Sequence, residues 1–123
     1  MGDIIVWADI PCTNLERAMK FYAHVTGLAV DLMPGGGDVA VFSDPSSDQA
    51  AVSADLYLGG TPTDTGSTVY FGTNGDIDGM LTRVKEAGGT VMQEKQDMGA
   101  MVGWIAFFMD SEGNRIGLQQ PSS

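Results

Sequence analysis

The stretch IIVWADIPCTNLERAMKFYAHVTG, residues 4–27, contains the first two elements of the fold and sets the pattern for the rest. Residues 4–10 are rich in β-branched and aromatic side chains and predict a strand. We expect Pro11 to end this strand, because proline cannot donate to a ladder. Thr13 and Glu16 have the spacing of a capping box at a helix start. Apolar residues then follow at helical spacing, at Leu15, Ala18, Met19, Tyr22 and Val25. The glycine that closes the stretch is typical of a helix C-terminus.

The rest of the first half alternates short strand patterns with turn residues. Three successive glycines at 35–37 predict a hairpin turn, and DPSSD at 44–48 predicts a loop. The strands expected around them are 28–33, 39–43 and 51–58. The segment GGTPTDTGS at 59–67 is rich in Gly, Pro and Thr and predicts a linker.

After this linker the same pattern begins again. A strand is expected at 68–73, and either Asp76 or Asp78 can cap a second helix that ends at Gly88. The apolar stripe of that helix comprises Ile77, Met80, Leu81 and Val84. The strands expected after it are 90–94, 102–109 and 115–120, with a tight turn at 110–114.

The two halves share this order of elements and also a local sequence echo. AVFSD at 40–44 resembles AFFMD at 106–110, and each stands before a loop and a final strand. Internal duplication is a signal of fold. We therefore expect an α+β fold in which two βαβββ modules form curled mixed sheets. The expected division of the single domain 1–123 is module one at about 1–58, the linker at 59–67 and module two at about 68–120.

The composition narrows the range of partners. Six Lys and Arg against sixteen Asp and Glu give a net charge of −10, which repels both nucleic acid and anionic membranes. Apolar residues make up 43% of the 123 residues, which is typical of a folded domain and not of a disordered chain. No apolar run has the length of a membrane span. The single cysteine and the lack of a basic leader lead us to expect a cytoplasmic protein.

Three segments resemble the vicinal oxygen chelate superfamily, which includes the glyoxalase I, bleomycin resistance and extradiol dioxygenase families. They are DIPCTNLERA at 9–18 with the following Phe21, Tyr22 and Gly27; AGGTV at 87–91; and GWIAFF at 103–108 with DSEGNRIGL at 110–118. The resemblance extends over nearly the whole chain. It implies that each module curls into half of an open barrel, that paired modules enclose a cavity, and that the protein is a homodimer.

The resemblance also implies a divalent metal held by His, Gln or Glu side chains from the first and last strands of each module. In this chain the first-strand position is Trp7 and the last-strand position is Gly117. The remaining positions are Thr68 or Val69 and Ala54 or Asp55. Tryptophan and glycine side chains cannot bind a metal, so we expect no metal cofactor. The alternative is a shifted ligand set, in which side-chain oxygens of Asp9, Asp55 and Gln119 hold the metal. Groups of oxygen ligands without histidine more often line a polar pocket.

The pocket expected in place of the metal site combines aromatic and polar side chains. Its candidate residues are Trp7, Asp9, Asp55, Tyr57, Tyr70, Trp104 and Gln119. The aromatic rings could stack on a flat ligand or simply fill the core. Asp9, Asp55 or Gln119 could orient a polar or cationic group, and the acidic chain would attract cations.

His24 and Cys12 are expected to have no catalytic role. His24, the only histidine, falls beside the apolar stripe of the first helix and is expected at the surface. Cys12 has no base next to it in the sequence and is expected to be an inert, partly buried thiol.

Three functions remain open at this stage. The first is a non-catalytic protein of the bleomycin resistance type, which binds or sequesters a small molecule. The second is a metal-dependent lyase, isomerase or dioxygenase of the glyoxalase type with the shifted ligand set. The third is a structural dimer that binds no ligand. Fold resemblance by itself does not choose among them.

Overall fold

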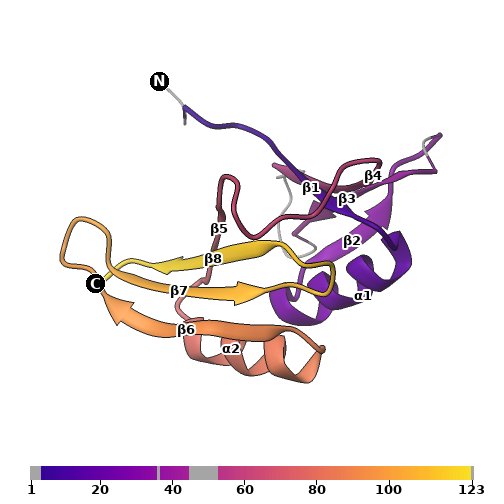
Figure 1. Cartoon of the computed structure of the whole chain (residues 1–123). Coiled ribbons are helices and arrows are strands. Elements are labelled where there is room, and N and C mark those ends of the chain that lie inside the picture. The colour runs from indigo at the N-terminus through magenta and orange to yellow at the C-terminus, as the bar shows by residue number, and fades with distance from the viewer. Residues whose placement is uncertain (1–3, 36, 45–52, 123) are drawn as a thin grey trace.

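The computed structural model describes residues 4–35, 37–44 and 53–122, and these form two four-stranded mixed sheets with one helix against each (Figure 1). The first module comprises β1 (Ala8–Cys12), α1 (Leu15–Thr26), β2 (Ala29–Leu32), β3 (Val39–Ser43) and β4 (Ala54–Leu58). The second comprises β5 (Val69–Gly72), α2 (Ile77–Glu86), β6 (Thr90–Asp97), β7 (Trp104–Met109) and β8 (Arg115–Gln120). Neither helix is long and apolar enough to cross a membrane.

Both sheets have the same topology. The strand order is β1-β4-β3-β2 in the first sheet and β5-β8-β7-β6 in the second. In each sheet the first strand of the module pairs in parallel with the last, and the other pairs are antiparallel. The duplicated βαβββ architecture predicted from the sequence is therefore confirmed, and the two sheets do not close into a barrel.

The first strand lies farther along the chain than predicted. The sequence pattern placed it at 4–10, whereas β1 covers residues 8–12 and includes Pro11. Pro11 did not end the strand, because β1 pairs only with β4 in the described sheet and one side of its backbone needs no donor. Residues 4–7 instead run outward from the start of β1 (Figure 1).

The start of α1 also differs by one residue from the predicted capping box. Asn14, and not Thr13, is the N-cap, and its side chain accepts a hydrogen bond from the backbone N–H of Arg17. Thr13 is instead hydrogen-bonded to Glu112 of the second module. Gly27 ends the helix with a positive φ of 73°, as predicted. Asp76 is the N-cap of α2, which resolves the choice between Asp76 and Asp78.

Other boundaries differ modestly from the prediction. β6 extends to residue 97 through register shifts, and β7 begins at 104 rather than 102. Residues 59–67 contain no helix or strand, and Gly35 has the positive φ of a turn residue. The rest of the predicted 44–48 loop, from residue 45 on, and the first two residues of the predicted 51–58 strand lie outside the described residues.

The two modules share one core within the chain. Tyr22 of α1 packs on Phe42 of its own module and on Phe71 of the other, with ring centroids 5.5 and 5.7 Å apart. Arg83 of α2 donates a hydrogen bond to the carbonyl of Val25 at the end of α1. The helices therefore join the modules on one side of the sheets, and the opposite sheet faces carry all the polar and aromatic candidates except Trp104.

Candidate functional site

Trp7, Asp9 and Asp55 form a hydrogen-bonded group at the β1–β4 pair. Asp9 and Asp55 are register partners on these parallel strands, so their side chains point from the same face of the sheet. The indole Nε1–H of Trp7 donates to Asp55 Oδ2 at 2.9 Å and to Asp9 Oδ1 at 3.2 Å. The structure therefore brings together three of the residues predicted to line a pocket.

Asp55 lies in an unusual environment for a carboxyl group. It is 6% exposed, and its Oδ1 atom has no hydrogen-bond donor among the described residues. Burial and the neighbouring Asp9 carboxyl together raise the pKa of Asp55 to about 6, although the hydrogen bond from the Trp7 indole opposes the increase. This side chain can therefore hold a proton at mildly acidic pH.

Tyr70 and Gln119 lie on the corresponding face of the second sheet. Tyr70 pairs in register with Gly117, and a Cβ atom built on Gly117 would lie only 2.3 Å from the Tyr70 ring. The same ring contacts Phe107 edge to face at a centroid distance of 5.7 Å. The tyrosine thus occupies the space that a side chain at position 117 would need.

A cavity of about 670 Å³ lies between the start of the first sheet and β5. Trp7, Thr68, Val69, Ala54 and Tyr70 all line it. Most of its other lining residues are apolar; they include Ile5, Leu28, Phe42 and Phe71. This cavity therefore gathers several of the positions at which the family resemblance implies metal ligands, and presents aromatic and aliphatic surface there.

Gln119 belongs to a second, adjoining cavity of about 400 Å³, which shares Tyr70 with the first. Its amide Nε2 donates to the backbone carbonyl of Val102 at 2.6 Å. Gln119 therefore lies on the second sheet and is engaged with the β6–β7 loop. It lines a different cavity from Asp9, so the structure does not bring the shifted oxygen set together in one of the cavities described.

Tyr57 and Trp104 do not line the Trp7–Tyr70 cavity. Tyr57 is directed at Gly60, where a Cβ atom would lie 2.2 Å from its hydroxyl. Trp104 pairs in register with Gln120, whose side chain accepts a hydrogen bond from the first backbone amide of α2. Trp104 therefore lies on the helix side of the sheet, packed against the core, with Lys95 over its ring at 5.0 Å. Alternation along β7 places it opposite to the Tyr70 face.

The residues present do not fit the divalent metal that the resemblance implies. Across the described ranges, no three His, Cys, Asp or Glu side chains are grouped so that they could hold a metal ion. Trp7 and Thr68 face the cavity, but an indole is not a metal ligand and a lone hydroxyl is a weak one. Gly117 supplies no side chain.

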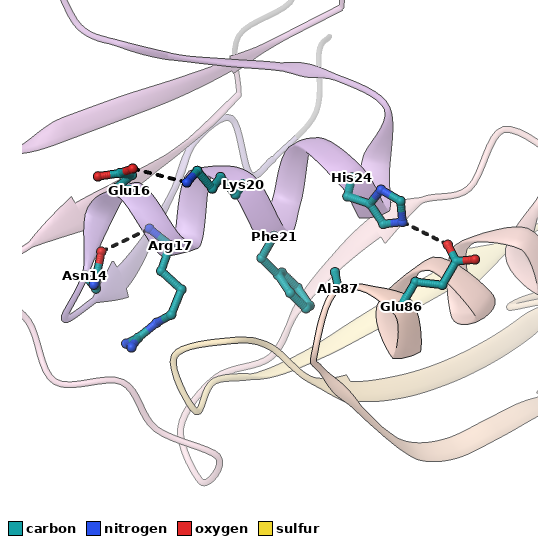
Figure 2. A pocket seen from close by; sticks show the side chains of 8 residues that line it. All are labelled: Asn14, Glu16, Arg17, Lys20, Phe21, His24, Glu86 and Ala87. Carbon is teal, nitrogen blue, oxygen red and sulfur yellow. Dashed lines mark hydrogen bonds and ion pairs between the residues drawn. The ribbon is translucent and has the colours of Figure 1, made fainter.

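A groove between α1 and the end of α2, shown in Figure 2, was not predicted from the sequence. Its volume is about 950 Å³, and its floor includes Phe21. Its charged side chains are paired with one another or with the second module: Lys20 with Glu16, His24 with Glu86, and Arg17 with Glu112. The helical spacing of Arg17, Lys20 and His24 was the signal available for this groove.

His24 and Cys12 have the environments predicted for them. His24 is exposed, and its ring lies 2.9 Å from Glu86. Cys12 is buried, with its thiol directed at the carbonyl of Tyr57. Burial, together with the charges of Glu112 and Asp110, raises the pKa of Cys12 to about 11. The thiol is therefore protonated at neutral pH and is a poor nucleophile.

Comparisons with known proteins agree with this architecture. "Putative glyoxylase CFP32" of Mycobacterium tuberculosis (strain CDC 1551 / Oshkosh) is 30% identical over 119 residues, which are 93% of this chain and 44% of that protein. The chain thus spans less than half the length of this curated relative.

Solved structures are similar over nearly the whole chain. A glyoxylase/bleomycin resistance protein/dioxygenase domain from Frankia sp. EAN1pec has a TM-score of 0.70 at 16% identity and covers 98% of this chain and 93% of its own. TnmS3, an antibiotic binding protein from Streptomyces sp. CB03234, has a TM-score of 0.63 at 25% identity and covers 99% of both chains. The family model of the Glyoxalase/Bleomycin resistance protein/Dioxygenase superfamily matches residues 4–118. The chain therefore belongs to this superfamily.

Proposed function

We propose that this protein binds an organic small molecule, without a resident metal, in the cavity between Trp7 and Tyr70. The observation that carries the proposal is the Tyr70 ring packed over Gly117. An aromatic ring there replaces the carboxylate that the resemblance implies, so this part of the cavity offers a stacking surface. A volume of about 670 Å³ is within the usual range for small-molecule sites.

The charge of the chain favours a cationic ligand. The net charge of −10 raises the local concentration of cations, and Asp9 and Asp55 lie beside the Trp7 indole. The half-exposed rings of Trp7 and Tyr70 can also attract a cation through their faces. The similarity to TnmS3, described as an antibiotic binding protein, supports a binding role rather than a catalytic one.

A thermal-shift screen of planar organic compounds, both cationic and neutral, tests the proposal. We expect at least one class, with planar cations first, to raise the Tm of the wild type. Trp7→Ala and Tyr70→Ala should each weaken binding at least tenfold. Trp104→Ala is the matched control, since its indole lies on the opposite sheet face, and it should retain binding. If no compound raises the Tm, or if only Trp104→Ala weakens binding, the assignment of the ligand site to the Trp7–Tyr70 cavity is contradicted.

Metal binding and turnover test the competing enzyme function. The wild type is dialysed against nickel or zinc, its metal content is measured, and it is assayed with the hemithioacetal of methylglyoxal and glutathione. We expect neither stoichiometric metal nor metal-dependent turnover. One tightly bound metal per chain, together with turnover, would replace the binding function by a glyoxalase-type activity.

A further inference from the structure

We infer that Asp9 and Asp55 share one proton and thereby position the Trp7 indole as a wall of the cavity. This role rests on the proposed function only in taking Trp7 as a ligand-contacting residue. Asp55 is a positioning residue here, because it acts on the cavity through Trp7.

The first support is the arrangement of the two carboxyl groups. They are register partners on adjacent parallel strands, and the same indole N–H contacts one oxygen of each. Two carboxyl groups this close repel each other when both are ionised. A shared proton or a bound cation removes this repulsion.

The second support is the unsatisfied oxygen. Asp55 Oδ2 accepts the Trp7 N–H, but Oδ1 is buried and has no donor within the described structure. A buried acceptor without a partner is costly. A proton on Oδ1 would turn this atom into a donor to Asp9, which would satisfy both carboxyl groups in one step.

No neighbouring cation takes the place of the proton within the described structure. On β3, the register partner of Asp55 is Val41, which is uncharged, and beyond it on β2 stands Asp31. Arg115 of β8 lines a small cavity with Asp9, but its guanidinium bonds Thr68 and stacks on Phe107 at 4.0 Å. On β4 itself, Tyr57 is the next side chain on this face and is directed at Gly60.

The consequence is a pH-dependent cavity wall. Since burial and Asp9 raise the pKa of Asp55 to about 6, the pair holds its proton below this pH and loses it above. When both groups are ionised, they repel each other. Asp9 is exposed on the edge strand β1 and is the partner that is free to move. Its displacement removes one of the two acceptors of the Trp7 N–H.

Tryptophan fluorescence tests this arrangement without any ligand. Trp104→Phe leaves Trp7 as the only tryptophan. We expect the emission of this variant to change with a midpoint near pH 6. Adding Asp55→Asn should abolish the transition and hold the emission near its acidic form, because the amide still accepts from Trp7 and donates to Asp9. Adding Asp55→Leu should instead give emission typical of an exposed indole at every pH.

Two further variants identify the partner. Adding Asp9→Asn should lower the midpoint, since the Asp9 carboxyl raises the pKa of Asp55. Asp31→Asn, which removes a carboxyl two strands away on the same row, should leave the midpoint unchanged. Circular dichroism verifies that each variant is folded. A flat titration between pH 4.5 and 7.5, or an unchanged transition in Asp55→Asn, would overturn the inference. If the Trp7 emission changes with a midpoint near pH 6 but the protein binds no compound, only the proposed function is overturned.

Discussion

At the scale of single residues, the contact between Gly117 and Tyr70 carries the proposed function. The position at which the family resemblance implies a carboxylate is a glycine, and the ring of Tyr70 fills the space above it. The absence of a ligand at 117 can be read from the sequence, because the NRIG segment aligns with the family motif. The identity of the occupant cannot, since it depends on the register between β5 and β8.

Replacing Gly117 by Ala tests this contact. The new methyl group would meet the Tyr70 ring, so we expect the free energy of unfolding to fall by about 1–2 kcal/mol. In a Tyr70→Ala background, Gly117→Ala should cost much less. A double-mutant cycle, measured by urea unfolding, gives the coupling free energy between the two positions. Gly72→Ala on β5 is the control, because its Cβ would meet nothing within 4 Å. Equal losses at 117 and 72 would contradict the packing described here.

The aromatic candidates illustrate the limit of residue-level prediction. Trp7 and Tyr70 line one cavity, but Trp104 and Tyr57 do not. Strand residues alternate between two faces, and a one-residue difference in phase reverses the assignment. On β7 both alternating sets of side chains are apolar, so the sequence does not distinguish them; the structure places Ile105 and Phe107 in the cavity with Tyr70 and Trp104 on the other face.

At the scale of elements, the β7–β8 turn closes the N-terminus of α1. Glu112 of this turn accepts hydrogen bonds from the backbone amides of Thr13 and Asn14 and is paired with Arg17. Burial alone would raise the pKa of Glu112, but the hydrogen bonds from Arg17 and these amides outweigh it and lower the pKa to about 2. The second module therefore supplies the acceptor for the amides of Thr13 and Asn14, whereas Asn14 itself caps the amide of Arg17.

Glu112→Gln should weaken this connection in a pH-dependent way. The lowered pKa means that the carboxylate contributes stability above pH 4.5 and loses it as the pH falls towards 2. We expect the variant to be less stable than the wild type by about 2 kcal/mol at pH 7, with the difference shrinking towards pH 2. Urea unfolding at several pH values measures it. Glu16→Gln removes an exposed ion pair and should change stability by less than about 0.5 kcal/mol. A pH-independent difference for Glu112→Gln would contradict this account.

Local sequence patterns predicted the order and type of the elements better than their ends. The helical stripes and glycine turns were sufficient for α1 and α2, because their apolar spacing is unambiguous. The limits of β1 depend on which strand pairs with it, and the N-terminus of α1 depends on Glu112, 98 residues from Asn14. Contacts so distant in the chain leave no local signal in one sequence.

At the scale of the whole molecule, the two modules are joined by their helices, and the segment before β1 carries exposed apolar side chains. Ile4, Ile5 and Val6 are 96%, 80% and 70% exposed at the start of β1. Such a run of apolar side chains is unusual on a monomer surface. It supports the homodimer that the family resemblance implies.

Light scattering coupled to size exclusion tests the proposed dimer. We expect the wild type to elute with the mass of two chains. Replacing Ile4 by Ser should shift the equilibrium towards one chain, since it removes exposed apolar surface without touching the core or the Trp7–Tyr70 cavity. Leu32→Ser, at an exposed position on β2, is the control and should leave the mass unchanged. A wild-type protein of single-chain mass at high concentration would contradict the dimer.

In the proposed function, ligands bind against Trp7 in an aromatic cavity. The chain has two tryptophans, so its two indole N–H resonances can be assigned with Trp7→Phe and Trp104→Phe. Proflavine, a planar organic cation, is titrated into the wild type, and both resonances are followed by nitrogen–proton correlation NMR. We predict that the Trp7 resonance shifts to saturation while that of Trp104 stays in place. A shift confined to Trp104, or no shift of either resonance, would contradict the claim.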